Sequence, residues 1–189
     1  MCCVQCAKCL GGMLIPLILL SVLTNLLLCF PALEIVQYEQ LSDEVTYFGG
    51  IIGCGIIMCF PAFSFIRLRR IKIRHCFGVD VCGPRCRMFN SIIYAIIGVI
   101  GASYGISLAW TAIKKGPKCD MGENRWDYPF YQWFLWNKCK RPVGIVPWNV
   151  TLFSIQLAIG CTQLTACIIQ ILNGLFGTTC GQWKCEKYC

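Results

Sequence analysis

Residues 67–90 read RLRRIKIRHCFGVDVCGPRCRMFN, and this short basic stretch decides how the rest of the chain is arranged. It contains seven of the chain's 17 Lys and Arg residues and a single acidic residue, Asp80. The segments on either side, 47–66 and 91–113, are apolar and carry no charged side chain. An uncharged run of about 20 residues is long enough to cross the hydrocarbon core of a bilayer as a helix. A short basic loop between two such runs is typical of the cytosolic side of a membrane protein.

The composition of the whole chain also indicates a membrane protein. Of its 189 residues, 57% are hydrophobic and only 14% are charged, whereas charged residues make up about 25% of a soluble domain. The formal net charge is +8. Because the basic residues border apolar spans rather than a polar surface, this charge does not indicate a nucleic-acid-binding protein.

Four apolar runs predict an all-α integral membrane protein built as a bundle of four transmembrane helices. Placing the loop 67–90 in the cytosol puts both termini in the cytosol as well. The predicted boundaries are a cytosolic tail over 1–9, helices over 10–30, 47–66, 91–113 and 149–176, a short extracellular loop over 31–46, a longer one over 114–148 and a cytosolic tail over 177–189.

Only two of the 17 cysteines fall in the predicted outer loops, Cys119 and Cys139. The outer compartment is oxidising, so we expect these two residues to form a disulfide that staples the second loop. Such a bond closes a loop of about 20 residues and contributes roughly 3 kcal/mol in the chain-entropy picture.

Ten cysteines lie on the predicted cytosolic side, close to the ends of the spans. Membrane-bound acyltransferases reach juxtamembrane thiols of this kind, so we predict palmitoylation. A zinc site is the alternative, because two groups of three cysteines could supply thiolates, Cys3 with Cys6 and Cys9, and Cys76 with Cys82 and Cys86. Their spacing is not that of a standard zinc module. We therefore predict neither a metal site nor a cofactor. The palmitoylation candidates are Cys2, Cys3, Cys6, Cys9, Cys76, Cys82, Cys86, Cys180, Cys185 and Cys189.

The four spans contain no Asp, Glu, Lys, Arg or His. Ion pathways, proton relays and intramembrane active sites usually need such groups within the membrane. The only histidine, His75, lies in the cytosolic loop, and no Ser–His–Asp arrangement is recognisable around it. We therefore predict a protein that is not an enzyme.

Two glycine pairs spaced by four residues lie in the second and third spans, Gly49 with Gly53 and Gly101 with Gly105. Small residues at this spacing let helix backbones approach closely in lipid. Two hypotheses follow. Either the pairs contact another copy or a partner protein, or they pack the chain's own helices against each other.

The fourth span carries three glutamines seven residues apart, Gln156, Gln163 and Gln170, which a helix places on one face. An amide that faces lipid is costly, so we expect the stripe to face the bundle and to form hydrogen bonds there, with Asn25 as a candidate partner. The alternative is that the stripe lines a polar ligand cavity.

Two further features concern modification and lipid contact. Asn149 begins the only N-glycosylation sequon, Asn-Val-Thr, at the outer mouth of the fourth span, where the glycosylating enzyme has restricted access. A basic cluster at the start of the cytosolic loop is expected to contact anionic lipid headgroups, at about 1 kcal/mol per basic residue. The cluster consists of Arg67, Arg69, Arg70, Lys72 and Arg74.

Several short motifs together resemble those of the transmembrane-4 L-six family, a group of tetraspanin-like tumour-antigen proteins. They are MCxxxCAKCLGG over 1–12, FPA over 60–62, CGPRC over 82–86, KGPKC over 115–119, LWNKC over 135–139, VPWNVTLFS over 146–154 and QILNG over 170–174. The resemblance covers nearly the whole chain. Two features depart from the family pattern, since the outer loop is shorter at 131–136 and the cytosolic loop is more basic at 67–74.

The resemblance implies a four-pass plasma-membrane glycoprotein that works through partners, namely tetraspanins, integrins and growth-factor receptors. The implied role is that of a non-enzymatic organiser or adaptor that influences cell adhesion, migration and proliferation. From the residues alone, membrane lipids and a second copy of the chain are further candidate partners, and nucleic acid is not. The alternative function is a small-molecule sensor, transporter or channel-associated subunit that uses the glutamine face of the fourth span.

Overall fold

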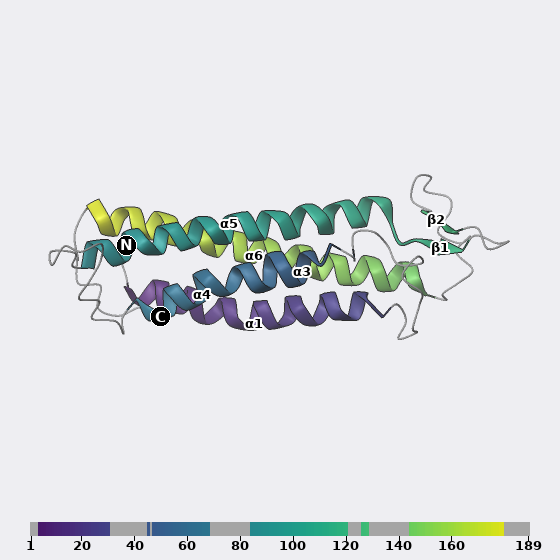
Figure 1. The fold of residues 1–189 in the computed structure, drawn as a ribbon, viewed down its shortest axis with the longest axis horizontal. Coiled ribbons are helices and arrows are strands. Elements are labelled where there is room, and N and C mark those ends of the chain that lie inside the picture. Colours follow the sequence, from purple (N-terminus) through teal and green to yellow (C-terminus); the bar gives the residue numbers. More distant parts are fainter. Residues whose placement is uncertain are drawn as a thin grey trace.

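A computed structural model describes residues 4–30, 45, 47–68, 84–120, 126–128 and 144–179 of the chain. Its main feature is a bundle of long helical segments that run along a common axis (Figure 1). The first segment is α1, Val4–Leu28, and the second consists of α3, Gly49–Ile51, the π-helix Ile52–Ile57 and α4, Met58–Arg67. The third and fourth are α5, Pro84–Lys115, and α6, Ile145–Thr179.

Four helical segments within the described residues are long and apolar enough to cross a membrane. They are Gln5–Leu28, Gly49–Arg67, Met88–Lys115 and Ile145–Thr178. The predicted all-α bundle of four transmembrane helices is therefore confirmed. The start of α1 and the end of α6 lie at the same end of the bundle, on the left of Figure 1, as four passes require.

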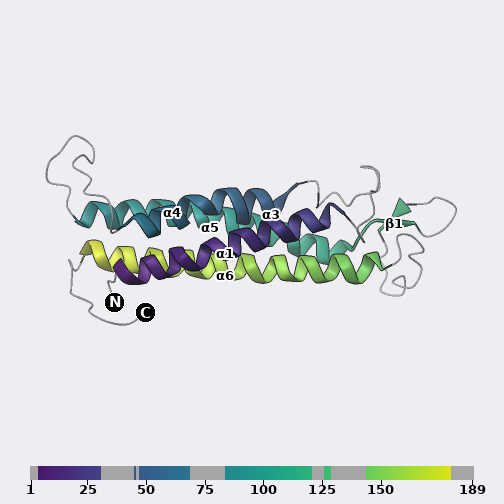
Figure 2. The ribbon, with the colours of Figure 1, turned by 90° about the horizontal axis from the view of Figure 1, so that it is seen from below.

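The four segments form a ring in which neighbours in the chain are also neighbours in space. α1 packs against α4 and α6, and α5 packs against the same two helices, with the most extensive contact between α5 and α6. In Figure 2, α1 lies along α6 and α4 lies along α5. Small buried side chains of α5 permit this close packing, because they let helix backbones approach in lipid. They are Ala95, Ala102, Ala109 and Ala112.

The helices extend beyond the apolar runs that predict them. α1 begins at Val4 rather than at residue 10, and α5 begins at Pro84 rather than at residue 91. The reason is that hydropathy marks where a chain meets hydrocarbon, whereas a helix continues until a residue breaks it. Pro84 is a favoured first residue of a helix. At the far end of α5, Gly116 adopts a left-handed conformation with φ of 75° and stops the helix.

The second span departs from a regular α-helix at its centre. Its π-helix, with the sequence IGCGII, contains two glycines, which weaken a regular helix. Pro61 follows four residues after Ile57. Since proline has no N–H, the Ile57 carbonyl loses the donor that a regular α-helix would supply. The widened turns lie next to this break in the hydrogen-bond ladder.

At the end of the bundle opposite the start of α1, two short strands form an antiparallel ribbon (Figure 1). β1 is Cys119–Asp120 and β2 is Trp126–Asp127. Cys119 lies opposite Asp127, and Asp120 lies opposite Trp126. The ribbon belongs to the segment 114–148, which the sequence assigns to the longer outer loop.

Candidate functional site

The central amides of the spans are gathered inside the bundle. Gln156, Gln163 and Gln170 are each at most 2% exposed, and so is Asn25 on α1. In contrast, five serine and threonine hydroxyls nearer to the surface donate to carbonyls of their own helix. Those hydroxyls belong to Ser107, Thr111, Thr162, Thr165 and Thr178. The exposed Tyr104 hydroxyl of α5 is an exception, because it donates to the Tyr47 carbonyl at 3.1 Å. The glutamines that join one helix to another lie in the interior.

Gln156 joins α6 to α1 and, through α1, to α3. Its Nε2 donates to the Ser21 hydroxyl at 2.6 Å, and the Ser21 hydroxyl donates to the Gly50 carbonyl at 2.9 Å. The Thr24 hydroxyl donates to Gln156 Oε1 at 2.6 Å. Both ends of the amide are therefore paired, and the chain of hydrogen bonds crosses three elements in the interior of the bundle.

Gln163 bonds to the π-helix. Its Nε2 donates to the Cys54 carbonyl at 2.9 Å. In a regular α-helix the Met58 N–H would point to the Cys54 carbonyl, but here it bonds the carbonyls of Gly55 and Ile56. The glutamine of α6 thus donates to a carbonyl that the irregular helix presents, which is how irregular backbone is tolerated within a membrane.

Gln170 forms a second polar layer, nearer to the start of α1. Its Nε2 donates to the Ser91 hydroxyl on α5 at 3.1 Å, and Asn173 donates to its Oε1 at 3.3 Å. The Ser91 hydroxyl in turn donates to the Met88 carbonyl at 2.8 Å. The three glutamines therefore reach three different neighbours, α1, the π-helix and α5.

The hydrogen bonds of Gln156 go to Ser21 and Thr24, whereas the sequence suggests Asn25 as a candidate partner. Within the described part of the chain, two buried amide oxygens have no hydrogen-bond partner, Asn25 Oδ1 and Gln163 Oε1. Ser21 and Thr24 are partners that the glutamine stripe does not reveal. Their spacing in the sequence could have indicated them, because Ser21, Thr24 and Asn25 are three and four residues apart and so lie on one face of α1.

The two glycine pairs lie at one interface within the bundle. A Cβ added to Gly53 would lie 2.6 Å from the Gly101 carbonyl oxygen, and one added to Gly101 would lie 2.8 Å from the Gly53 carbonyl oxygen. An added Cβ at Gly49 would lie 2.6 Å from Leu108, and one at Gly105 would collide with Cys54. In this structure the pairs pack the second span against α5.

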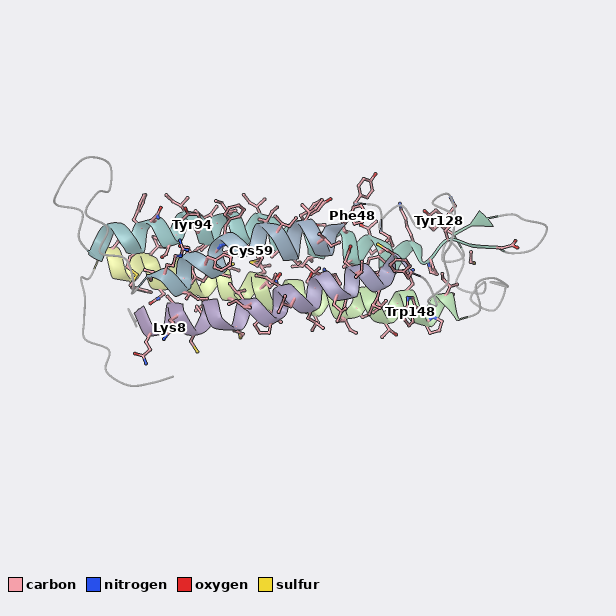
Figure 3. The ribbon with its side chains drawn as sticks, turned by 60° about the horizontal axis from the view of Figure 1, so that its bottom comes forward. Lys8, Phe48, Cys59, Tyr94, Tyr128 and Trp148 are labelled. Atoms are coloured by element: carbon pink, nitrogen blue, oxygen red, sulfur yellow. The ribbon has the colours of Figure 1, made fainter. Side chains whose placement is uncertain are left out.

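At the end of the bundle where α1 begins, Lys8 is exposed (Figure 3). Next to it on α1, Cys9 is exposed and Cys6 is half-buried. Arg67 is exposed at the end of α4. Cys86 lies in the first turn of α5. The described residues include no group of three or more His, Cys, Asp or Glu that could hold a metal ion. The remaining predicted site residues here lie outside the described residues: Cys2, Cys3, Cys76, Cys82, Cys180, Cys185, Cys189, Arg69, Arg70, Lys72 and Arg74.

At the other end, Cys119 is fully buried and disulfide-bonded. Cys139 lies outside the described residues, so the pairing of the two remains a prediction. Asn149 lies in α6 and is only 5% exposed. A bulky glycan on this side chain would have to displace its packing. The glycosylation of Asn149 also remains a prediction, and its burial weighs against occupancy.

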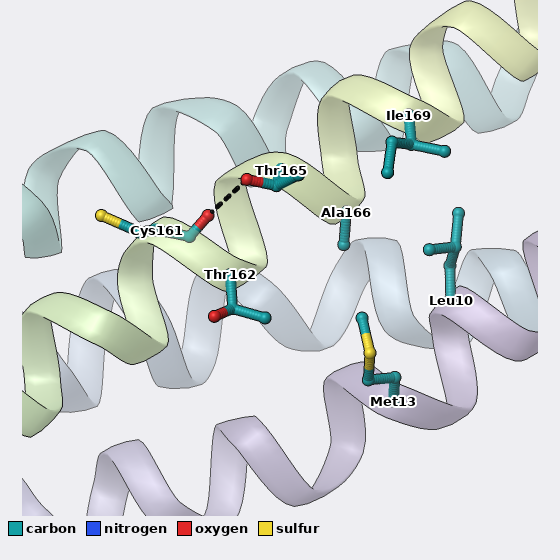
Figure 4. A pocket seen from close by; sticks show the side chains of 7 residues that line it. All are labelled: Leu10, Met13, Cys161, Thr162, Thr165, Ala166 and Ile169. Atoms are coloured by element: carbon teal, nitrogen blue, oxygen red, sulfur yellow. Dashed lines mark hydrogen bonds between the residues drawn. The ribbon is translucent and has the colours of Figure 1, made fainter.

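A groove runs between α1 and α6 on the outer surface of the bundle, with a volume of about 310 Å³ (Figure 4). Leu10 and Met13 line it from α1, and the residues of α6 that line it are Cys161, Thr162, Thr165, Ala166 and Ile169. The two threonine hydroxyls donate to carbonyls of their own helix, each at 2.8 Å. The groove therefore offers mainly apolar contacts.

Known proteins similar to the chain are membrane proteins of one family. The family described as L6 membrane protein matches residues 1–184. Transmembrane 4 L6 family member 4 from Rattus norvegicus is 48% identical over 98% of this chain and 95% of the relative, and that from Homo sapiens is 45% identical over the same shares. Transmembrane 4 L6 family member 1 from Homo sapiens is 40% identical over 96% of this chain and 95% of the relative. No solved structure matches the chain.

Proposed function

The chain belongs to the L6 membrane protein family, and from this we propose that it is a non-enzymatic organiser of other membrane proteins. It assembles laterally with tetraspanins, integrins and growth-factor receptors, and through them it influences cell adhesion, migration and proliferation. The observation that carries the proposal is the inward placement of the span amides, which leaves an apolar exterior for contact with lipid and with other transmembrane helices.

The exterior of the bundle supports this role. Leu19, Phe63 and Ile100 are each more than half exposed on α1, α4 and α5. Side chains of this kind suit lipid or another transmembrane helix, and they offer no group for chemistry. The buried polar residues described are amides and hydroxyls rather than the acids and bases that intramembrane catalysis needs. Both the apolar exterior and the lack of acids and bases among these buried polar residues agree with a docking role.

The proposal includes a location and two lipid contacts. The protein resides in the plasma membrane with both termini in the cytosol. Acyl chains on cytosolic cysteines anchor it at the inner leaflet, and the exposure of Cys9 supports this. The basic cluster that begins at Arg67 contacts anionic headgroups at the same end of the bundle.

Proximity labelling in intact cells tests the assembly. The full chain, fused to a labelling enzyme, is compared with a chimera in which residues 114–148 come from another family member. We expect tetraspanins, integrins and receptors to be enriched over an unrelated four-pass protein at equal expression, and the loop swap to change which of them are labelled. An identical set of neighbours for this chain and the unrelated protein would contradict the proposal.

A second candidate function is a small-molecule sensor, transporter or channel-associated subunit. The unpaired oxygens of Asn25 and Gln163 favour it, because a buried acceptor without a donor can receive one from a polar ligand. Solute flux through the purified protein in liposomes tests this function. Loss of flux in Gln163→Leu would assign the activity to the glutamine face, and absence of flux in the unchanged protein would reject it.

A further inference from the structure

The groove between α1 and α6 opens where hydrocarbon surrounds the protein. All of its lining residues lie within the candidate spans Gln5–Leu28 and Ile145–Thr178. Its lining on α6 extends from Cys161 to Ile169, which at 1.5 Å per residue is about 12 Å along the bundle axis. The lining of the groove on α6 therefore follows the direction in which the helix crosses the membrane.

The lining of the groove selects an apolar occupant. The hydroxyls of Thr162 and Thr165 are bonded to the carbonyls of Ala158 and Cys161, so they do not require a partner in the groove. Met13 contributes a flexible thioether that adapts to irregular shapes. The side chains that line an empty groove lose dispersion contacts. A flexible hydrocarbon chain would restore these contacts and needs no hydrogen-bond partner, so it is the occupant that fits this lining.

Cys9 lies at the end of the groove nearest to the first turn of α1. It directly precedes Leu10, which lines the groove, and it lies four residues before Met13, which also lines it. The side chains of Cys9 and Met13 therefore lie on the same face of α1. Its thiol is exposed and free. The charged side chain of Lys8 next to it is also exposed and lies at that end of the bundle in Figure 3. An ammonium group prefers the headgroup layer, which places Cys9 at the membrane surface.

We propose that the groove between α1 and α6 holds the acyl chain of S-acylated Cys9. This inference rests on the acylation of cytosolic cysteines in the proposed function and specifies where one chain lies. The Cys9 sulfur attacks the carbonyl carbon of a long-chain acyl thioester donor and forms a new S–C bond. The donor's S–C bond breaks, and the donor leaves as a free thiol with the proton that Cys9 loses. The attached chain then runs past Met13 and Thr165 towards Cys161.

The chain bound to Cys9 fixes α1 against α6 from outside the bundle. Its contacts add to the hydrogen bond between Gln156 of α6 and Ser21 of α1 inside the bundle. Because the tether makes binding intramolecular, the chain competes with free lipid at a high effective concentration. Acylation of Cys9 thus changes the lipid-facing surface that a partner helix meets.

Photo-crosslinking of the full chain tests the inference. Cells are supplied with a long-chain fatty-acid analogue that carries a photoactivatable group near its methyl end, and the irradiated, purified protein is digested and mapped by mass spectrometry. We expect a crosslink within one chain between the peptide containing Cys9 and residues 161–169 of α6. In Cys9→Ser this crosslink disappears, while label on the other cysteines remains.

A groove-filling variant provides a second readout. Thr165→Phe places a ring in the groove, so we expect about a fivefold loss or more of the crosslink to α6, with acylation of Cys9 unchanged. Thr165→Val keeps the shape and retains the crosslink, and Ile96→Phe, on the lipid-exposed side of α5, leaves it unaffected. If Thr165→Phe does not fold, the crosslink map of the unchanged chain and of Cys9→Ser decides the question alone.

Three outcomes overturn the inference. Acylated Cys9 that crosslinks only to lipid or to another chain rejects the groove as its binding site but leaves lipid anchoring intact. A crosslink to α6 that persists in Cys9→Ser shows that a phospholipid or another cysteine's chain occupies the groove. Absence of label from Cys9 rejects the inference, and absence from every cysteine also rejects the acylation in the proposed function.

Discussion

Gln156 shows at the residue scale how a single amide holds helices together where water is absent. It accepts from Thr24 and donates to Ser21, and both bonds are 2.6 Å long. An unpaired amide in hydrocarbon costs several kcal/mol. The net gain from pairing is smaller, about 0.6 kcal/mol per interhelical bond and up to about 1.7, because an unfolded chain in the membrane also finds partners.

We expect Gln156→Leu to lower the free energy of unfolding by about 1–2 kcal/mol, since two interhelical bonds are lost. Thr24 does not become unpaired, because its hydroxyl also lies 2.9 Å from the Leu20 carbonyl and 3.0 Å from the Ser21 carbonyl. Equilibrium unfolding in mild detergent or bicelles measures the change. Thr162→Val is the matched control, since its hydroxyl bonds to the carbonyl of Ala158 on its own helix. Equal losses in the two variants would contradict the role assigned to Gln156.

The coupling between Gln156 and Ser21 gives a sharper test of the network. The Ser21 hydroxyl accepts a hydrogen bond from Gln156 and donates one to the Gly50 carbonyl, so Ser21→Ala also removes the hydrogen bond to α3. We expect the double variant with Gln156→Leu to lose less stability than the sum of the two single losses, because both changes remove the same bond. Strict additivity in a double-mutant cycle would show that the two side chains act separately.

At the scale of whole elements, the glycine pairs decide how close the second span lies to α5. Gly53 and Gly101 each lie against the other's carbonyl oxygen, and backbone atoms cannot move aside as a flexible side chain can. The structure therefore supports the intramolecular hypothesis for these pairs. Gly12 on α1 differs, because a Cβ there would meet nothing within 4 Å.

Gly53→Ala is expected to destabilise the bundle by about 1–3 kcal/mol, as other overpacked sites do. Gly12→Ala is the matched control and should be neutral or stabilising by about 0.5–1 kcal/mol, since alanine suits a helix interior better than glycine. Thermal unfolding in detergent measures both changes, and light scattering measures the oligomeric state. A change of oligomeric state in Gly53→Ala without loss of stability would favour the partner-face hypothesis instead.

The elements differ in how far the sequence predicts them. The four spans and the shared face of the glutamines follow from uncharged runs and a period of seven, which need no knowledge of neighbours. The π-helix at Ile52–Ile57 has local causes in its glycines and Pro61, but it also receives the hydrogen bond from Gln163 of α6, so the local pattern alone does not specify it. The groove beside Met13 depends on the distance between two helices that are far apart in sequence. Contacts of this kind come only from the assembled bundle.

At the scale of the whole molecule, basic side chains lie at both ends of the bundle. Lys8 and Arg67 are exposed at one end, and at the other Lys114 lies over the Trp110 ring and Lys115 over the Tyr128 ring, 4.9 and 5.8 Å from the centroids. Aromatic rings at the level of the headgroups are typical of a membrane-spanning protein. Trp148 lies at the same end of the bundle (Figure 3), and its Nε1 donates to the Leu27 carbonyl at 3.4 Å.

The proposed topology predicts which parts of the molecule face outwards. We expect an epitope at either terminus to require permeabilisation for antibody binding, and an epitope inserted within 114–148 to be accessible on intact cells. The reason is the basic loop 67–90, which resists translocation. Flow cytometry of intact and permeabilised cells measures accessibility. Staining of a terminal epitope on intact cells would reverse the orientation and, with it, the assignment of cysteines to compartments.

A disulfide between Cys119 and Cys139 would tie the ribbon at the end of α5 to the segment that leads into α6. Cys119 is fully buried where β1 begins, next to Ile145 and Val146 of α6, so a constraint there reaches the helix pair with the largest contact. We expect Cys119→Ala, Cys139→Ala and the double variant to lose the same stability, roughly 3 kcal/mol, because each removes one and the same bond.

Cys161→Ala, in the lipid-facing groove, is the control. Equilibrium unfolding gives the losses, and a non-reduced peptide map identifies the linked fragment. Additive losses from the two single variants, or both residues recovered as free thiols, would show that they are not paired.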